Sequence, residues 1–186
     1  IRRQVLEHFN RKSDSLTPLS GLSLLDIGCG GGLLCEPLAR LGAEVTGVDP
    51  AQKNIGVARL HAAQSGLSIQ YEQQTVEDLV AQGRQFDIVT AMEVVEHVAD
   101  PRAFLASLAA RLAPGGLLVI HDMHLNAEKT GPLPVAEYSV ILMHSTEGKC
   151  YSLGELDELF RAIGFRDLRH TPTAADRSIV TAVKPG

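Results

Sequence analysis

The stretch from Leu24 to Leu34 most constrains what this chain can fold into. An apolar run that ends at Ile27 predicts a short buried strand, and a cluster of glycines separates it from an apolar-periodic helical segment. A strand, a tight turn and a helix N-terminus in that order form the place where an α/β sheet receives a nucleotide-like ligand. Glycines there can take positive φ and admit ligand atoms close to the backbone, whose N–H groups offer donors.

The spacing of the glycines distinguishes two kinds of nucleotide site. The dinucleotide motif is G-x-G-x-x-G, whereas this chain has G-x-G-G-G over Gly28–Gly32, with Leu33 where the third glycine would stand. Asp26, just before the turn, can reach the amino group of a ligand, and a site without a pyrophosphate tolerates an acid there. These features favour S-adenosylmethionine, which has a zwitterionic amino-acid end. NAD and a plain turn without a ligand are the alternatives.

Length and charge narrow the class of protein. At 186 residues we expect a single domain spanning 1–186. The net charge of −5, with no compensating basic cluster, argues against a nucleic-acid partner. No apolar run approaches the roughly 20 residues that cross a bilayer. The chain begins at Ile1 rather than Met, so an N-terminal piece is expected to be missing.

Cysteine usage points to a compartment. Cys29, Cys35 and Cys150 are odd in number and form no C-x-x-C pair, which favours the reducing cytoplasm. Cys29 lies in the glycine turn, where it is interpreted as a small residue filling a tight space rather than as a reactive thiol.

Periodicity and turn residues predict alternating strands and helices. Helices are expected over 1–11, 33–41, 53–65, 101–112 and 153–163, with a short helix entered from 75–79 and an irregular stretch after residue 120. Strands are expected over 22–27, 44–48, 68–72, 86–91, 117–120, 165–169 and 178–183. The alternation predicts a mostly parallel sheet with helices on both faces. The short connection between the last two strands requires an antiparallel hairpin. This is the Rossmann-like arrangement of class I methyltransferases.

Residues after the second and third strands are candidates for cofactor binding. Asp49 follows the glycines by about twenty residues, where a carboxylate can accept hydrogen bonds from ribose hydroxyls. It can also cap the helix that follows. Pro50 adjoins it and is assigned to the same site. Val76 and Glu77 follow the third strand, where an adenine would be bound.

The segment after the fourth strand, 91–98, concentrates polar groups in an apolar setting. Met92 is assigned to the cofactor, and Glu93, Glu96 and His97 would share one face if the segment were helical. Two carboxylates and an imidazole could bind a divalent cation such as Mg²⁺, or His97 could act as a general base with Glu96 beside it. The structural alternative has Glu93 capping, Glu96 facing water and His97 packed under the next helix.

A metal site would need a fourth ligand from beyond the fifth strand. The candidates are His121, His124 and His144. Each of these histidines is also compatible with a packing or solvent-facing position.

Three segments closely resemble the ubiquinone-biosynthesis O-methyltransferases: 24–34 (LLDIGCGGGLL), 42–50 (GAEVTGVDP) and 91–101 (AMEVVEHVADP). The helix over 53–66 agrees as well, so the resemblance covers residues 1 to about 120. It implies methyl transfer from S-adenosylmethionine to phenolic hydroxyls of polyprenylated catechol-type intermediates. It also implies that the E-x-x-E-H motif, here Glu93, Glu96 and His97, is involved in divalent-cation dependence, and that the protein associates with membranes.

The resemblance weakens from His121 onward. The family has a Thr-Leu-Asn-Arg-Thr-like run at this point, of which this chain keeps Leu125, Asn126 and Thr130. Residues 136–138 match an Ala-Glu-Tyr sequence of the family. The end of the chain, including Asp176-Arg177-Ser178, is more similar to small-molecule and polyketide O-methyltransferases. We therefore expect a cofactor-binding half over 1–120 and an acceptor-side half over 121–186, whose acceptor stays open.

The sequence thus predicts a cytoplasmic S-adenosylmethionine-dependent O-methyltransferase with a small phenolic acceptor, which could be a ubiquinone precursor or a polyketide-like phenol. Gly28, Gly30 and Gly32 would admit the methionine part, Asp26 its amino group and Asp49 the ribose. Two other functions stay open, a catalytically silent cofactor-binding partner in a biosynthetic complex and an NAD-dependent oxidoreductase. Association with the inner membrane is a further expectation, although no basic amphipathic helix supports it.

Overall fold

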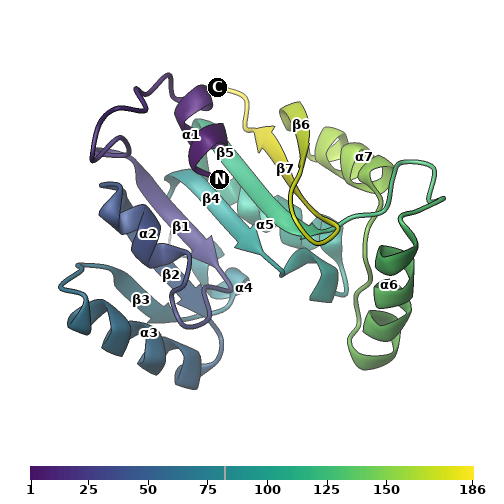
Figure 1. Cartoon of the computed structure of the whole chain (residues 1–186), viewed down its shortest axis with the longest axis horizontal. Helices are drawn as coiled ribbons and strands as arrows, with labels where there is room; N and C mark the ends of the chain where they lie inside the picture. Colours follow the sequence, from purple (N-terminus) through teal and green to yellow (C-terminus); the bar gives the residue numbers. More distant parts are fainter. Residues whose placement is uncertain (82) are drawn as a thin grey trace.

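The computed structural model, which describes residues 1–81 and 83–186, is organised around one seven-stranded sheet (Figure 1). The strand order is β3-β2-β1-β4-β5-β7-β6. The pairings among β1 to β5 are parallel, whereas β7 runs antiparallel to both β5 and β6. The predicted mostly parallel α/β sheet with a C-terminal hairpin is confirmed. The strands span Ser23–Ile27 (β1), Glu44–Asp49 (β2), Gln70–Gln73 (β3), Phe86–Met92 (β4), Leu112–Met123 (β5), Arg166–Pro172 (β6) and Arg177–Val183 (β7).

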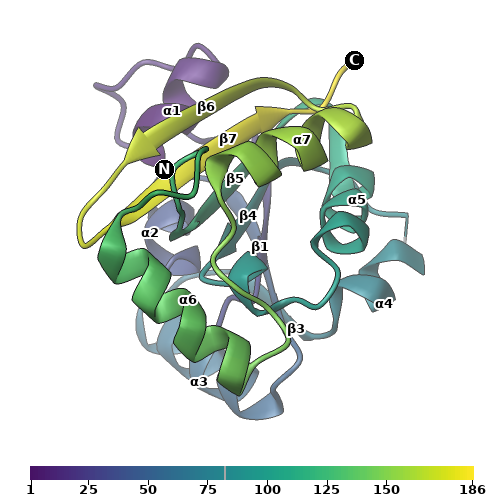
Figure 2. The ribbon, with the colours of Figure 1, turned by 90° about the vertical axis from the view of Figure 1, so that its right-hand side faces the viewer.

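Helices cover both faces of the sheet, as predicted (Figures 1 and 2). Val5, Leu38 and Ile55, from α1, α2 and α3, belong to the apolar cluster on one face. Leu79 and Phe160, from α4 and α7, join the cluster on the other face together with residues of α5. The helices span Arg2–His8 (α1), Cys35–Arg40 (α2), Gln52–Gln64 (α3), Val76–Ala81 (α4), Pro101–Arg111 (α5), Leu133–Ser145 (α6) and Leu153–Ile163 (α7), with a 3₁₀ turn at Val95–His97 (η1).

Local sequence explains where several helices begin and end. Asp100 accepts a hydrogen bond from the N–H of Ala103, and proline at the first position opens α5. Ser152 and Glu155 form a reciprocal capping box at the start of α7. Gly164 ends α7 at φ 101°, a left-handed conformation that costs glycine little. These signals are local, which is why the sequence placed both helices correctly.

The fifth strand is longer than predicted. The sequence predicts a strand over 117–120, after Pro114-Gly115-Gly116, but β5 already begins at Leu112. Phe86 pairs with Leu112 and Ile88 with Leu117, so the extra residues form an irregularity inside the strand. A bulge can contain proline and glycine without ending the pairing on either side.

The segment after β5, expected to be irregular, contains α6. Pro132 precedes the helix and Pro134 lies in its first turn, where proline is compatible with a helix although it resembles a loop signal. The helix is apolar on most sides, so no 3.6-residue contrast marks it. It lies beyond the carboxyl ends of β4 and β5, outside both helical layers (Figures 1 and 2). Beneath it is a small apolar cluster of Met123, Val135, Leu142 and Cys150.

The described helices do not include one that is both long and apolar enough to cross a membrane. The residues with exposed apolar side chains on α6 are Leu133, Val140, Ile141 and Met143.

Candidate functional site

The glycine turn joins β1 to α2 with a backbone that requires glycine. Gly28, Gly30 and Gly32 have φ of 68°, 53° and 83°, all in the left-handed region. A Cβ on Gly28 would lie 2.7 Å from a methyl carbon of Val94, and one on Gly32 would collide with the hydroxyl of Tyr71. A Cβ on Gly30 would meet no heavy atom within 4 Å. The turn is therefore closely packed at Gly28 and Gly32 and open at Gly30.

Asp49 ties this turn to the next helix. Its Oδ2 accepts a hydrogen bond from the N–H of Gly30 at 3.1 Å, and its Oδ1 accepts from the N–H of Ala51 at 2.8 Å. Asn54 donates its side-chain amide to the same Oδ1 at 3.1 Å. The carboxylate lies at the carboxyl end of β2, as predicted. It bonds the N-cap residue Ala51 and the side chain of Asn54, and α3 has no side-chain cap hydrogen bond, so the alternative of a helix cap is not what the structure shows. Lone-pair capacity remains on Oδ2 for a ligand hydroxyl.

Asp26 is deeper than the sequence suggested. Its side chain is 2% exposed; Oδ1 accepts from the hydroxyl of Thr90 at 2.6 Å and Oδ2 from the thiol of Cys35 at 3.2 Å. Burial raises the pKa of this carboxyl to about 6, against the lowering effect of the two hydrogen bonds. Asp26 thus lies beneath the turn, bound to β4 and α2.

The other predicted cofactor residues lie along the same edge with different exposure. Pro50 is exposed and its carbonyl accepts a hydrogen bond from Gln73. Val76 is buried in the core at the start of α4. Met92 is half-buried at the end of β4. The side chain of Glu77 lies outside the described residues. Their roles stay predictions.

Glu93 is paired with an arginine from the far end of the chain. Arg177 donates from Nε to Oε1 at 2.8 Å and from Nη2 to Oε2 at 3.0 Å, a two-pronged contact between half-buried side chains. His121 places Nδ1 3.6 Å from the same Oε1 and bonds Thr173 through Nε2 at 3.0 Å. Glu93 itself has φ 54°, so it ends β4 in a left-handed conformation. The β6–β7 hairpin is thereby attached to the end of β4.

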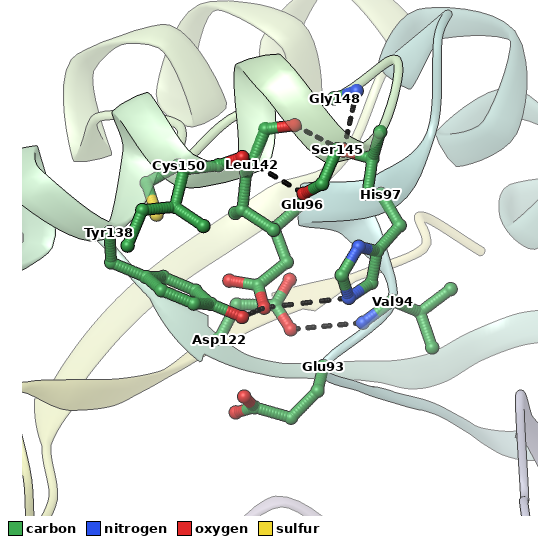
Figure 3. Close-up of polar contacts among 12 residues, drawn as sticks. Glu93, Val94, Glu96, His97, Asp122, Tyr138, Leu142, Ser145, Gly148 and Cys150 are labelled. Carbon is green, nitrogen blue, oxygen red and sulfur yellow. Dashed lines mark hydrogen bonds and ion pairs between the residues drawn. The ribbon is translucent and has the colours of Figure 1, made fainter.

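Glu96 points inward rather than to water. Its side chain is 1% exposed, and its Oε1 accepts a hydrogen bond from the hydroxyl of Tyr138 on α6 at 3.3 Å (Figure 3). His97 places Nε2 3.7 Å from the same oxygen. Burial raises the pKa of the Glu96 carboxyl, and the nearby charge of Glu93 adds to the effect. The imidazole of His97 is 43% exposed, so it remains accessible beside a buried acid.

Asp122 brings a further carboxylate to the cluster. It is 2% exposed, and its Oδ1 accepts from the N–H of Val94 at 3.2 Å. Burial raises the pKa of the carboxyl to about 8, and the charge of Glu96 is the next contribution. Within the described residues, Asp122 Oδ2 and Glu96 Oε2 are buried without a hydrogen-bond partner. Asp122 thus positions the 93–97 segment through its backbone.

The loop after α6 supports the same segment by backbone contact. A Cβ on Gly148 would collide with the carbonyl oxygen of Glu96 and lie 2.9 Å from the carbonyl carbon of His97. Only glycine allows this close approach without displacing one of the two backbone segments. Figure 3 shows Gly148 above the η1 turn, with Tyr138 reaching Glu96 from the side.

The predicted metal residues do not converge. Among the described residues, no group of three or more His, Cys, Asp or Glu side chains is arranged to bind a metal ion. The expected shared helical face is wrong, because η1 contains only Glu96 and His97 of the three and Glu93 precedes it at positive φ. In Figure 3 the Glu93 side chain extends away from the carboxyl group of Glu96. The described residues thus offer the predicted divalent cation no preformed site, and its binding stays a prediction.

The histidines proposed as a fourth ligand are dispersed. His121 bonds the β6–β7 hairpin as described above, and His124 is buried with its Nδ1 2.7 Å from the Ser178 hydroxyl. His144 is exposed on α6, with its Nδ1 2.7 Å from the carbonyl oxygen of Val140. His121 lies beside Glu93, but within the described residues these three rings form no joint metal site with Glu93, Glu96 and His97.

Three side chains of this cluster were not predicted to take part in it: Asp122, Tyr138 and Arg177. Tyr138 and Arg177 lie in segments that resemble O-methyltransferases, at 136–138 and 176–178, but nothing in the sequence links either residue to Glu93 or Glu96. For Asp122 the signal was its place after β5, because the carboxyl ends of adjacent parallel strands share one edge.

A groove of about 400 Å³ opens at the opposite edge of the sheet and is lined by residues including Thr46, Arg84 and Phe86. Arg84 there is paired with Glu72 at 2.9 Å. Among the described residues lining it, no buried side-chain atom lacks a partner. It lies where the strands begin, away from the ligand edge of such a sheet. We assign it no role.

Comparison with known proteins identifies the family. A family model described as a methyltransferase domain matches residues 2–170. The chain belongs to this methyltransferase family. Membership decides between the two interpretations of the glycine turn, in favour of a methyltransferase over an NAD-dependent oxidoreductase.

Individual relatives and one solved structure refine this placement. The ubiquinone biosynthesis O-methyltransferase of Cereibacter sphaeroides (strain ATCC 17025 / ATH 2.4.3) is 56% identical over 126 residues, 68% of this chain and 51% of the relative. That of Chelativorans sp. (strain BNC1) is 47% identical over 164 residues, 88% of this chain and 65% of the relative. The crystal structure of magnesium protoporphyrin IX methyltransferase from Synechocystis PCC 6803 with bound SAH superposes with a TM-score of 0.70 at 25% identity, covering 89% of this chain and 75% of that one.

Coverage limits what these relatives imply. The chain spans about half the length of the first curated relatives it matches.

Proposed function

We propose that this protein transfers the methyl group of S-adenosylmethionine to the hydroxyl of a small phenolic or catechol-type acceptor. A ubiquinone precursor is the first candidate, since the relatives above are named for that pathway. The observation that carries the proposal is the contact between the glycine turn and the 93–97 segment. The methyl group of Val94 leaves no room for a Cβ on Gly28, so the turn packs against the segment that carries Glu96 and His97.

The cofactor is supported by the geometry of the turn and by the family. Gly30 offers open backbone at the carboxyl edge of the sheet, and Asp49 keeps acceptor capacity beside it. A structurally similar methyltransferase is recorded with bound SAH, the demethylated product. In our proposal Gly28, Gly30 and Gly32 admit the methionine part and Asp49 binds the ribose hydroxyls. Asp26 acts on the amino group from beneath the turn, and Pro50, Val76, Glu77 and Met92 line the rest of the site.

The chemistry asks two things of this chain. S-adenosylmethionine supplies an electrophilic methyl group on a sulfonium, and the acceptor oxygen displaces it in line, so that the sulfur keeps the bonding electrons. The chain must therefore hold acceptor and donor in contact, which is an entropic contribution. It must also take the proton of the hydroxyl as the new O–C bond forms.

His97 is the proposed proton acceptor. Its Nε2 faces the Glu96 carboxyl at 3.7 Å, so a neutral imidazole that carries its proton on Nε2 leaves the Nδ1 lone pair free. The buried carboxyl beside it stabilises the imidazolium that forms. Tyr138 fixes Glu96 from α6, so this residue of the second half positions the proton acceptor.

The test is the variant His97→Ala. We expect turnover to fall by roughly 10²- to 10⁴-fold, the usual contribution of a general base. S-adenosylhomocysteine binding should remain at the wild-type level. Transfer of labelled methyl to a panel of catechols and polyketide-like phenols gives the rate, and calorimetry gives the affinity.

His144→Ala is the matched control, because His144 is exposed on α6 and its ring bonds a carbonyl of its own helix. It should behave as wild type. A His97→Ala protein with weakened S-adenosylhomocysteine binding and normal turnover at saturation would remove His97 from this role. Tight binding with no turnover on any phenol by the wild type would make the protein a silent partner instead.

Cellular placement is a separate proposal. We infer action in the cytoplasm from the cysteine usage, and peripheral attachment to a membrane or a biosynthetic complex from the expected lipophilic acceptor. Co-sedimentation with lipid vesicles of the wild-type protein would test the membrane arm.

A further inference from the structure

The ion pair between Arg177 and Glu93 is the most specific contact at the acceptor side of the site. It joins residues 84 positions apart, one at the start of β7 and one just after β4. Two nitrogens of one guanidinium meet two oxygens of one carboxylate at 2.8 and 3.0 Å. This fork geometry fixes both the position and the orientation of the carboxylate, which a single lysine contact would not do.

The acid that Arg177 binds belongs to a cluster of three. Glu93, Glu96 and Asp122 all belong to the same edge of the sheet, and the charge of Glu93 acts on both of the others. Two of these carboxyl groups are almost fully buried, and each has an oxygen without a partner among the described residues. A carboxylate such as Glu93 keeps its charge in a poorly solvated place when a cation pairs with it, and Arg177 is that partner.

The compensation that the resemblance implies is a divalent cation on Glu93, Glu96 and His97. Both oxygens of Glu93 already accept from Arg177, so a dication at those oxygens would face a guanidinium about one hydrogen bond away. Like charges at that separation repel strongly where solvent is partly excluded. Arg177 and a metal ion therefore compete for the same carboxylate.

We propose that Arg177 is the built-in cation of this site: its guanidinium holds Glu93 in place and supplies the positive charge that a bound metal would otherwise bring to the acceptor side. This inference rests on the proposed function, which makes this edge of the sheet the acceptor side. Arg177 is a positioning residue, since it acts through Glu93. It comes from the half of the chain that departs most from the resembled family.

Two consequences follow directly. The wild-type protein has no tight site for a divalent cation at Glu93, and its turnover does not depend on one. Replacing Arg177 by an uncharged residue of similar length frees the Glu93 carboxylate among other acids. Arg177→Met should therefore create a cation site that the wild type lacks.

The experiment measures Mn²⁺ binding by electron paramagnetic resonance in five proteins: wild type, Arg177→Met, Arg177→Lys, Glu93→Gln and the double variant Arg177→Met/Glu93→Gln. We expect at least tenfold tighter Mn²⁺ binding in Arg177→Met than in wild type. The double variant should lose that gain, because the freed carboxylate has become an amide. Arg177→Lys keeps the charge and should stay near wild type, which serves as the control if Arg177→Met folds poorly.

Activity gives a second, independent readout. Wild-type turnover measured in a chelator should stay within about twofold of turnover with added Mg²⁺. Turnover that disappears in the chelator and returns with Mg²⁺ overturns the proposal. Tight Mn²⁺ binding by wild type that Glu93→Gln abolishes, or no gain in Arg177→Met, overturns it as well.

S-adenosylhomocysteine affinity, measured on the same samples, separates this inference from the proposed function. Failure of the wild type to bind S-adenosylhomocysteine contradicts the methyltransferase proposal and leaves the Mn²⁺ comparison to stand on its own result. Normal S-adenosylhomocysteine binding with a metal-dependent wild type contradicts only the role given to Arg177.

Discussion

The two sides of the proposed site are built in different ways. The cofactor side consists of the glycine turn with Asp26 and Asp49, so its main residues lie close together in the sequence, although Asp26 is also bonded by Thr90, 64 positions away. Asp49, for example, is 19 positions from the glycine whose N–H it accepts. The acceptor side consists of Glu93–His97 with Asp122, Tyr138 and Arg177, and its contacts span 42 and 84 positions. The cofactor side is a short stretch of sequence, whereas the residues of the acceptor side come together only through tertiary packing.

The largest expected effect separates two neighbouring glycines of the cofactor side. Gly32→Ala should cost about 2–5 kcal/mol of unfolding free energy, from positive φ and from the collision with Tyr71. Gly30→Ala has the same kind of strain but open space, so it should cost about 1–2 kcal/mol. Because its methyl group enters the space open to the ligand, Gly30→Ala should nevertheless lose S-adenosylhomocysteine binding. Urea unfolding and calorimetry on both variants check this.

Equal stabilities for the two variants would mean that Tyr71 does not support the turn. Wild-type affinity in a folded Gly30→Ala protein would move the ligand away from the turn.

The buried acid of the cofactor side gives a pH dependence. The pKa of Asp26 is raised from its ordinary value of 3.8 to about 6, so between these values the native state binds more protons than the unfolded state. Unfolding free energy should therefore fall as pH rises from about 4 to about 6, by at most about 1.4 kcal/mol per pH unit. Asp26→Asn removes the titrating group and should flatten this slope in urea unfolding.

The exposed acid Asp14 provides the control, since Asp14→Asn should leave the slope unchanged. A wild-type slope that Asp26→Asn does not alter would place the titration elsewhere.

The acceptor side is tested by Gly148, whose backbone packs against that of Glu96 and His97. Gly148→Ala should cost about 1–3 kcal/mol, because its Cβ cannot fit against the backbone of Glu96 and His97 without a shift. That shift should reduce turnover while S-adenosylhomocysteine binding stays at the wild-type level, because the glycine turn is untouched. Rates and affinities measured together decide whether the two sides are separable. Parallel losses of both would contradict the division.

The smallest effect is a gain. Gly56 lies inside α3 with no heavy atom within 4 Å of its ideal Cβ. Gly56→Ala should raise the unfolding free energy by about 0.5–1 kcal/mol through helix propensity alone. Activity should not change, which makes this variant the control for all substitutions of glycine by alanine. A loss of stability would indicate a neighbour that the structure does not place there.

What the sequence predicted follows the same division. The strand, glycine turn and helix around Gly30, and the carboxylate at Asp49, have local signals, and the structure places them at one edge of the sheet. The helix α6 was missed because its apolar residues surround it and its prolines resemble a loop. The partners of Glu93 and Glu96 were missed because no periodicity links positions 93 and 177 or 96 and 138. Only the fold brings those side chains together.

The burial of the Glu96 side chain was not predicted, for a related reason. An acid in a short segment is usually solvated, and the interpretation of a helical face required a helix longer than η1. Burial of Glu96 depends on Tyr138 and on the Gly148 loop, both from the half whose resemblance is weaker.

The central claim is that the glycine turn binds S-adenosylmethionine beside Glu96 and His97. The most direct measurement is a calorimetric titration of folded wild-type protein with S-adenosylhomocysteine, with NAD titrated in parallel. We expect micromolar binding of S-adenosylhomocysteine, no binding of NAD, and loss of binding in the folded Gly30→Ala variant. A folded wild-type protein that does not bind S-adenosylhomocysteine would contradict the account.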